Sequence, residues 1–269
     1  MKRLCVNDYA MAYIEVGEGS PLVCVHGSFG DFRTFSSVLG PLSRRHRVIV
    51  LSLRHFFPEQ WDGRGGRFTI AQHVSDLIAF IGKLDVGRVD LFGHSRGGHL
   101  AFRVAQQRGD LLRKLILAEP GGELDASLAP SDGGGAPRVN RIAAATEMIA
   151  QGDLDGGLKY FIDGNNGEGS WDRLAASSQQ EYRDNARTVL GQINEQRQPF
   201  TRQDAEAISV PTLFIGGEKT PGFLPVILRA LAGSVRGART VIIPEATHHM
   251  IRQDPVRTSA AVLDFLAAS

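Results

Sequence analysis

Residues 89–100 read VDLFGHSRGGHL and combine a strand-like apolar run, a Gly-x-Ser-x-Gly turn and the start of a helical pattern. A serine is lifted above the edge of a sheet only where the chain turns sharply, with strained dihedral angles, and larger neighbours would collide with the helix and strand. Gly93 and Gly97 remove those collisions. The Ser95 hydroxyl then lies at a helix N-terminus, which favours negative charge. The stretch therefore predicts a strand, a tight turn with a reactive serine, and a helix.

Further short apolar runs alternate with amphipathic stretches along the chain. This alternation is typical of an α/β fold with a mostly parallel sheet flanked by helices. Residues 3–7 and 10–16 are expected to form an antiparallel hairpin at the sheet edge. The last helix is expected to start after Asp254, its N-cap, and to bury Val256, Leu263 and Leu266. The predicted strands after the hairpin are Leu22–Val25, Val48–Leu53, Val89–Phe92, Leu115–Ala118, Thr212–Ile215 and Thr240–Ile243.

One long region, from Gly121 to Ala207, contains no strand-like run. It begins with a linker rich in glycine and proline, and helices are expected near residues 138–151, 154–163, 170–177 and 178–196. We therefore predict two domains. Residues 1–121 and 206–269 form the α/β core, and residues 122–205 form an inserted helical cap, or lid.

Composition excludes several functional classes. A chain of 269 residues with 42% hydrophobic and 22% charged residues is typical of a soluble globular protein. The net charge of +1 gives no electrostatic reason to expect a nucleic-acid or membrane partner. No run is long enough for a signal peptide or a membrane span, and Cys24 is expected to be a buried thiol. We therefore expect a cytoplasmic protein.

A second motif, VHGSFGD, lies at residues 25–31. With this motif and the Ser95 turn, the chain resembles the α/β-hydrolase superfamily over nearly its whole length. The resemblance implies that the backbone N–H groups of Ser28 and Arg96 hold a developing oxyanion. It also implies a catalytic base in the loop after the last strand, seven residues before a proline. His248 has that spacing to Pro255, whereas His249 is one residue short.

The catalytic acid is the departure from the family pattern. Many members read G-x-x-D-P after the penultimate strand, and here Thr220 stands where the aspartate is expected. Glu119, in LILAEPGG, follows the strand after the Ser95 helix, and the order Ser95…Glu119…His248 suits the fold. Zearalenone-type lactone hydrolases and some haloalkane dehalogenases resemble this arrangement. Glu119 is the favoured acid, Glu218 is the alternative, and Glu245 is a weaker candidate.

Aromatic residues near these motifs are candidates for an apolar substrate pocket, with packing in the core as the alternative. They are Phe29, Phe56, Phe57 and Trp171.

The resemblance implies a metal-free and cofactor-free serine hydrolase. It would cleave a small-to-medium, apolar carboxylic ester or lactone through an acyl-enzyme. Its only expected partner is that small-molecule substrate. Two alternatives stay open. One is a cofactor-free dioxygenase or carbon–carbon bond hydrolase that uses the same residues, and the other is a non-catalytic ligand receptor.

Overall fold

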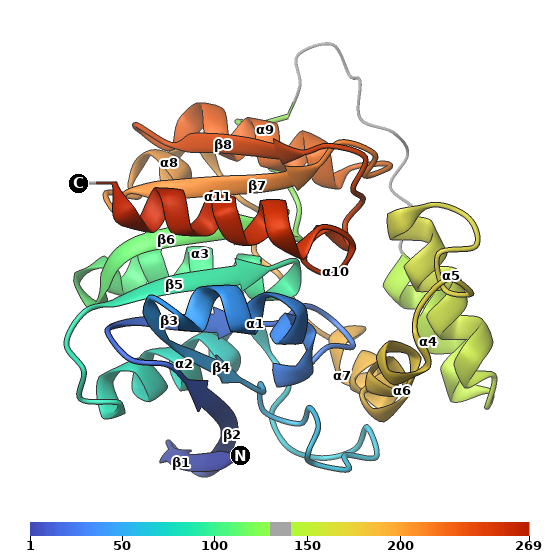
Figure 1. The fold of residues 1–269 in the computed structure, drawn as a ribbon. Coiled ribbons are helices and arrows are strands. Elements are labelled where there is room, and N and C mark those ends of the chain that lie inside the picture. Colours follow the sequence, from blue (N-terminus) through green and yellow to red (C-terminus); the bar gives the residue numbers. More distant parts are fainter. Residues whose placement is uncertain (130–140, 269) are drawn as a thin grey trace.

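The computed structural model describes residues 1–129 and 141–268, and its centre is an eight-stranded sheet (Figure 1). The strands lie in the order β1-β2-β4-β3-β5-β6-β7-β8. β1 pairs with β2 and β2 with β4 in antiparallel fashion, and the remaining neighbours are parallel. The predicted edge hairpin and mostly parallel sheet are therefore confirmed. The strands are β1 (Lys2–Val6), β2 (Tyr9–Val16), β3 (Ser20–Val25), β4 (His46–Leu51), β5 (Val89–His94), β6 (Leu112–Ala118), β7 (Thr212–Gly217) and β8 (Arg239–Ile243).

Both faces of the sheet are buried, because alternate side chains of a strand point to opposite faces. In β3, Val23 and Val25 join one hydrophobic cluster, whereas Leu22 and Cys24 join the other. The first cluster includes residues of α2 (Ile70–Lys83), α3 (Arg96–Arg108), α8 (Arg202–Glu206) and α9 (Leu224–Ser234). The second includes residues of η1 (Phe32–Phe35), α1 (Ser36–Ser43), α10 (Met250–Gln253) and α11 (Pro255–Ala267).

The face that α11 buries differs from the prediction. Asp254 caps the helix as expected, since its side chain accepts a hydrogen bond from the Arg257 N–H. Val256, however, is 75% exposed. Val262 and Phe265 are buried instead, with Leu263 and Leu266 packed partly against the same cluster. Successive residues of a helix are rotated by about 100°, so Val256 and Thr258 point to opposite sides of α11. Thr258 is the buried one, and the prediction that Val256 is buried was therefore wrong.

The segment between β6 and β7 contains a separate group of helices, here called the helical insertion (residues 141–192). Figure 1 shows it to one side of the core, beyond the ends of the strands. Its apolar side chains form most of a third hydrophobic cluster, which includes Leu158, Ile162, Trp171 and Tyr182 and also Phe29 of the core. The insertion consists of α4 (Arg141–Ala150), α5 (Leu154–Asn166), α6 (Ala176–Asp184), η3 (Ala186–Thr188) and α7 (Val189–Gln192), whereas η2 (Gly109–Leu111) belongs to the core.

Two of the four helices predicted in this region were wrong in extent. Residues 168–174 form turns instead of a helix, because the Asp163 carboxylate accepts hydrogen bonds from the N–H groups of Gly169 and Trp171. The predicted helix over 178–196 is divided into α6, η3 and α7. The helices predicted near residues 138–151 and 154–163 correspond to α4 and α5, although residues 138–140 lie outside the described residues.

The ends of the predicted cap pack into the core rather than with the insertion. Leu128, Phe200 and Ala205 belong to the hydrophobic cluster beneath α2 and α3. Leu124 and Phe200 also form a parallel bridge. The side-chain packing therefore gives an insertion narrower than residues 122–205. Within the described residues, no helix combines the length and apolarity needed to cross a membrane.

Buried histidines give a testable dependence of stability on pH. Burial lowers the pKa of six histidines: to about 4 for His26, below the ordinary value for His46, and well below it for His73, His94, His99 and His249. The unfolded chain therefore binds protons below pH ~6.5 that the folded protein excludes, so acid favours unfolding. Each group contributes up to about 1.4 kcal/mol per pH unit. Burial raises the pKa of Asp90 and Glu181, which acts in the opposite sense but involves fewer groups.

We therefore expect the free energy of unfolding to fall steeply as pH decreases from about 6.5 to 5. Urea denaturation at pH 5.5, 6.5 and 7.5 measures this. A free energy that is unchanged or larger at pH 5.5 would contradict the prediction.

Candidate active site

The predicted turn between β5 and α3 is present, and its backbone is strained at Ser95. Ser95 has φ 54° and ψ −118°, a conformation that side chains rarely adopt. The two glycines of the motif are required sterically. A Cβ on Gly93 would lie 2.3 Å from the Gly97 carbonyl oxygen, and one on Gly97 would lie 2.2 Å from that of Val25. The serine hydroxyl therefore stands at the N-terminus of α3, at the carboxyl end of β5.

Glu119 and His248 meet at the same sheet edge. The Nδ1–H of His248 donates to Oε2 of Glu119 at 2.7 Å, and both side chains are buried. The other oxygen, Oε1, accepts from the backbone N–H of Gly217 in β7, at 2.9 Å. Because the carboxylate holds the hydrogen on Nδ1, the Nε2 atom of His248 keeps its lone pair and can accept a proton.

The alternative carboxylates lie elsewhere. Glu218 accepts a hydrogen bond from the Glu245 N–H at 2.9 Å, and the Glu245 side chain is exposed beside Lys219. Thr220, at the vacant acid position, is buried, and its hydroxyl has no hydrogen-bond partner among the described residues. The contact with His248 is made by Glu119, one strand away from the position where many relatives carry the acid.

Two other histidines, His94 and His249, lie next to His248 but make different contacts. The His94 ring lies 4.6 Å from that of His248, and its Nε2–H donates to the His248 carbonyl at 2.9 Å. His94 therefore supports the loop that carries His248. His249 points into the helical insertion, where its Nε2 lies 3.0 Å from the Tyr182 hydroxyl and 3.3 Å from the Asn166 amide nitrogen.

Two backbone N–H groups near Ser95 are available to an oxyanion. Across residues 1–129 and 141–268, no acceptor is found for the N–H of Ser28 or of Arg96. The turn that carries Ser28 is fixed by His26, whose Nδ1–H donates to the Gly27 carbonyl and whose Nε2 accepts from the Leu53 N–H. The Ser28 hydroxyl donates to Gln192 of α7, so the insertion also holds this turn.

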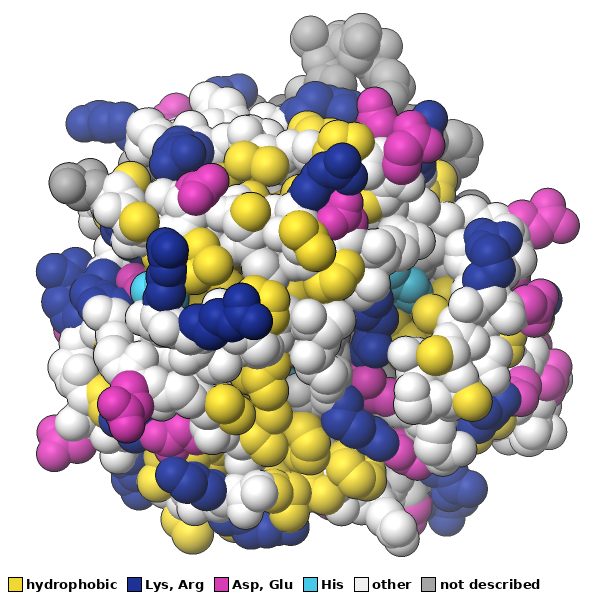
Figure 2. Space-filling model, in the orientation of Figure 1, with side chains coloured by type: hydrophobic (Ala, Val, Ile, Leu, Met, Phe, Trp, Pro, Cys, Tyr) yellow, Lys and Arg dark blue, Asp and Glu magenta, His cyan; other side chains and the backbone are white. Residues whose placement is uncertain are grey.

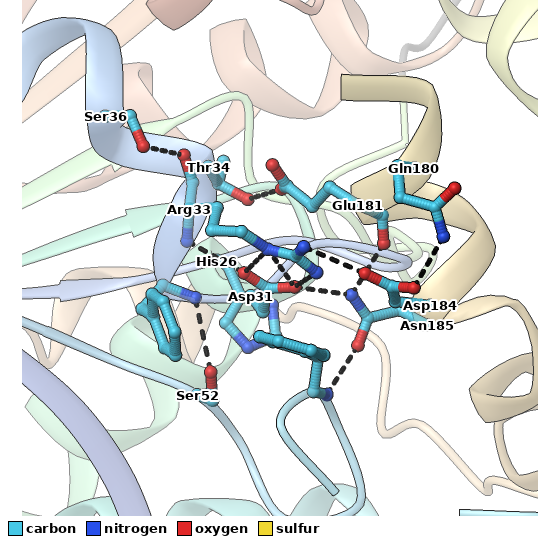
Figure 3. Close-up of polar contacts among 12 residues, drawn as sticks. His26, Asp31, Arg33, Thr34, Ser36, Ser52, Gln180, Glu181, Asp184 and Asn185 are labelled. Carbon is cyan, nitrogen blue, oxygen red and sulfur yellow. Dashed lines mark hydrogen bonds and ion pairs between the residues drawn. The ribbon is translucent and has the colours of Figure 1, made fainter. Parts of the chain in front are cut away.

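A buried polar network joins the same turn to α6 (Figure 3). Asp31 accepts from the Arg33 guanidinium and from the Asn185 side-chain amide, at 2.6 and 2.7 Å. Thr34 donates to Glu181 at 2.7 Å. Asn185 also accepts from the Phe57 N–H at 2.7 Å. The Ser28 turn and the helical insertion are therefore held together by charged and polar contacts as well as by apolar packing.

Two small cavities meet at Ser95 and His248, which line both of them. The inner chamber, about 30 Å³, extends toward His94, Tyr182 and His249. The outer chamber, about 80 Å³, extends toward Arg96, Arg141, Arg197, Ile142, Phe223 and Leu224. Figure 2 shows a furrow between the core and the helical insertion, where a histidine is visible beside Lys or Arg side chains.

The aromatic residues predicted for the pocket do not line either chamber. Phe56 is fully buried in the core against His26, and Phe57 contacts Arg33 and Phe32. Phe29 and Trp171 belong to the hydrophobic cluster of the insertion. The alternative of core packing therefore describes Phe29, Phe56 and Trp171, because each has apolar neighbours that remove it from the chambers.

The residues that line the chambers from the insertion were missed by sequence reasoning. α5 contributes Phe161, Ile162, Asn165 and Asn166 to the inner chamber. These positions repeat with a spacing of four along the helix and therefore share one face. That spacing was the available signal, but it does not indicate which part of the core the face covers.

The chain is similar in sequence and in fold to known proteins. The model of the alpha/beta hydrolase family matches residues 22–261. The chain belongs to this family. A curated relative, the 3-hydroxybutyrate-oligomer hydrolase of Cupriavidus necator, is 25% identical, and the alignment covers 97% of this chain and 94% of the relative.

Solved structures share the fold. The enol-lactonase from Burkholderia xenovorans aligns with a TM-score of 0.81 and 20% identity, over 99% of this chain and all of the other. An esterase from Exiguobacterium antarcticum aligns equally well, with a TM-score of 0.81 and 20% identity over 99% of both chains.

Replacing Asn185 tests how the insertion is attached. In an Asn185→Ala variant, the buried Asp31 carboxylate and the Phe57 N–H each lose a hydrogen-bond partner, and we expect the free energy of unfolding to fall by about 2 to 4 kcal/mol. Urea denaturation measures the loss. Asn194→Ala is the matched control, because Asn194 is exposed. Equal stabilities for the two variants would refute the attachment.

Proposed function

We propose that this protein is a serine hydrolase that cleaves a small carboxylic ester or lactone through an acyl-enzyme. The observation that carries the proposal is the 2.7 Å hydrogen bond between His248 Nδ1 and Glu119 Oε2, beside a strained Ser95 that shares both chambers with His248. This arrangement supplies a nucleophile, a base and a group that orients the base.

In the proposed reaction, the Ser95 oxygen attacks the carbonyl carbon and its proton passes to Nε2 of His248. The N–H groups of Ser28 and Arg96 stabilise the negative oxygen of the tetrahedral intermediate. Collapse breaks the ester bond, and His248 returns the proton to the leaving alcohol. A water molecule, deprotonated by His248, then attacks the acyl-enzyme, and a second collapse releases the acid and restores Ser95. Throughout, Glu119 stabilises the imidazolium.

The comparisons support the ester class. Oligomers of a hydroxy acid are joined by ester bonds, and an enol-lactone is a cyclic ester, so both named proteins act at a carbonyl carbon bonded to oxygen. The chambers favour small groups, because a cavity of about 150 Å³ holds a molecule the size of benzene and the larger chamber measures about 80 Å³.

Labelling with a fluorophosphonate probe distinguishes this proposal from its rivals. An activated Ser95 is expected to form a stable phosphonyl adduct, detected as a mass increase on the peptide containing residue 95. Ser95→Ala should remain unlabelled and should lose esterase activity on p-nitrophenyl acetate. In a dioxygenase or carbon–carbon bond hydrolase, His248 would deprotonate the substrate instead. A folded wild-type protein that is neither labelled nor active on esters would overturn the proposal.

The position of the acid gives a separate prediction. Glu119→Gln removes the charge that orients His248 and stabilises its imidazolium, so kcat is expected to fall by about 10² to 10⁴. Glu218→Gln is the matched control and should leave kcat nearly unchanged, since Glu218 contacts the Glu245 backbone. Far-ultraviolet circular dichroism checks that both variants fold. The reverse order of the two effects would assign the acid to Glu218.

A further inference from the structure

The outer chamber is basic. Arg96, Arg141 and Arg197 line it, and no aspartate or glutamate is found among the described residues that do so. One buried carboxylate, Glu195, accepts from both Arg96 and Arg197. Two of the three guanidinium groups are therefore held by a shared internal partner. The chamber nevertheless opens directly onto Ser95 and His248, where the proposed reaction takes place.

Arg141 differs from the other two arginines. Within residues 1–129 and 141–268, it has no hydrogen-bond or ion-pair partner, although it is only partly exposed. Its position is defined by two glycines. A Cβ on Gly164 of α5 would lie 2.3 Å from Arg141 Nε, and a Cβ on Gly222, in the loop after β7, would lie 3.9 Å from a terminal nitrogen. The Arg141 side chain therefore passes over α5 at Gly164 and ends near Gly222, in the loop after β7.

Helix stability does not explain an arginine at this position. Arg141 is the first residue of α4, where the helix dipole disfavours a positive charge. The acidic residues of the adjoining surface groove do not neutralise it either. The Asp163 carboxylate accepts from Gly169, Trp171 and Lys159, and among the described residues Glu168 forms no ion pair with Arg141.

Arg96, which also lines this chamber, has a second donor without an acceptor. The Nε–H group of Arg96 is buried, and no described residue accepts from it, although the terminal nitrogens of Arg96 contact Glu195 and His73. Buried donors without an acceptor are uncommon in folded proteins and destabilise them. A guanidinium presents several donors in one plane, and this arrangement matches the two oxygens of a carboxylate.

We infer that the outer chamber binds the carboxylate of an ester that carries a free acid group, with Arg141 as the residue that determines this specificity. The inference rests on the proposed function, because it names the substrate class of the same site. The carboxylate would lie against the Arg141 guanidinium while the ester carbonyl of the same molecule lies at Ser95. The preferred substrates are then half-esters of dicarboxylic acids, or esters of hydroxy acids whose carboxyl group is free.

Hydrolysis of two matched esters tests the inference. Monoethyl succinate carries the carboxylate, and ethyl succinamate replaces it with a neutral amide of the same shape. We expect a higher kcat/KM for monoethyl succinate, and a preference that weakens between 0.05 and 0.5 M NaCl as the charges are screened. Arg141→Gln should lower kcat/KM for monoethyl succinate by about tenfold or more, and for ethyl succinamate by less than about twofold.

Three further variants serve as controls. Arg187→Gln removes a charge from an exposed position on the same insertion and should change neither substrate. Arg141→Lys keeps the charge without the planar donors and should retain part of the preference. Gly164→Ala keeps the charge but forces the Arg141 side chain to shift, so it should reduce the preference. Equal kcat/KM values for the two esters in the wild type, or equal losses for both in Arg141→Gln, would overturn the inference while leaving the hydrolase intact.

A binding measurement separates this inference from the proposed function. Calorimetric titration of monoethyl succinate into Ser95→Ala, and into Ser95→Ala combined with Arg141→Gln, reports on the carboxylate without catalysis. Binding to Ser95→Ala that is lost with Arg141→Gln supports the site even if the wild type is neither labelled by the fluorophosphonate nor active on esters, a result that would refute the hydrolase alone. The absence of binding to Ser95→Ala would overturn the carboxylate site.

Discussion

The buried hydrogen bond between His248 and Glu119 is the interaction on which the site depends. A carboxylate removed from water is costly unless its oxygens are paired, and here one oxygen binds His248 and the other the Gly217 N–H. These partners come from different strand ends. Ser95, Glu119 and Gly217 are brought to one edge by the parallel pairing of β5, β6 and β7. The register of these strands therefore determines whether the constellation forms.

This pairing also explains how position 220 can be a threonine. The strand that carries the acid in many relatives still contributes here, but through its backbone, since the Gly217 N–H holds Glu119 in place. Glu119 has φ 39°, a conformation that is unfavourable for a residue with a side chain. Two polar partners for its carboxylate offset that strain.

The parts of the structure that follow from local sequence were the predictable ones. The strands, the Ser95 turn and the cap at Asp254 depend on neighbours within a few residues, so apolar runs, glycines and capping residues identify them. Glu119 could be placed beside His248 because parallel strand ends share an edge. The residues that form the walls of the chambers could not be predicted from the sequence, because they depend on how the insertion packs on the core. Phe56 is a clear case, since an aromatic residue in a loop near the site fits a pocket or a core equally well until its neighbours are known.

The α/β core and the helical insertion each contribute residues to the site. The sheet edge supplies Ser95, Glu119 and the backbone N–H groups, whereas the insertion supplies Arg141 and the face of α5 that carries Phe161, Ile162, Asn165 and Asn166. They are not independent, because Gln192, Glu181 and Asn185 of the insertion contact the turn that carries Ser28. Moving the insertion away as a whole would break buried polar contacts and would also disturb the turn that carries the Ser28 N–H, the proposed oxyanion donor. The outer chamber offers a different route, since Arg141 lines both it and the surface groove on the insertion. In the proposed reaction, a substrate that enters there would meet the Arg141 guanidinium before it reaches Ser95, so selection by charge would precede the chemistry.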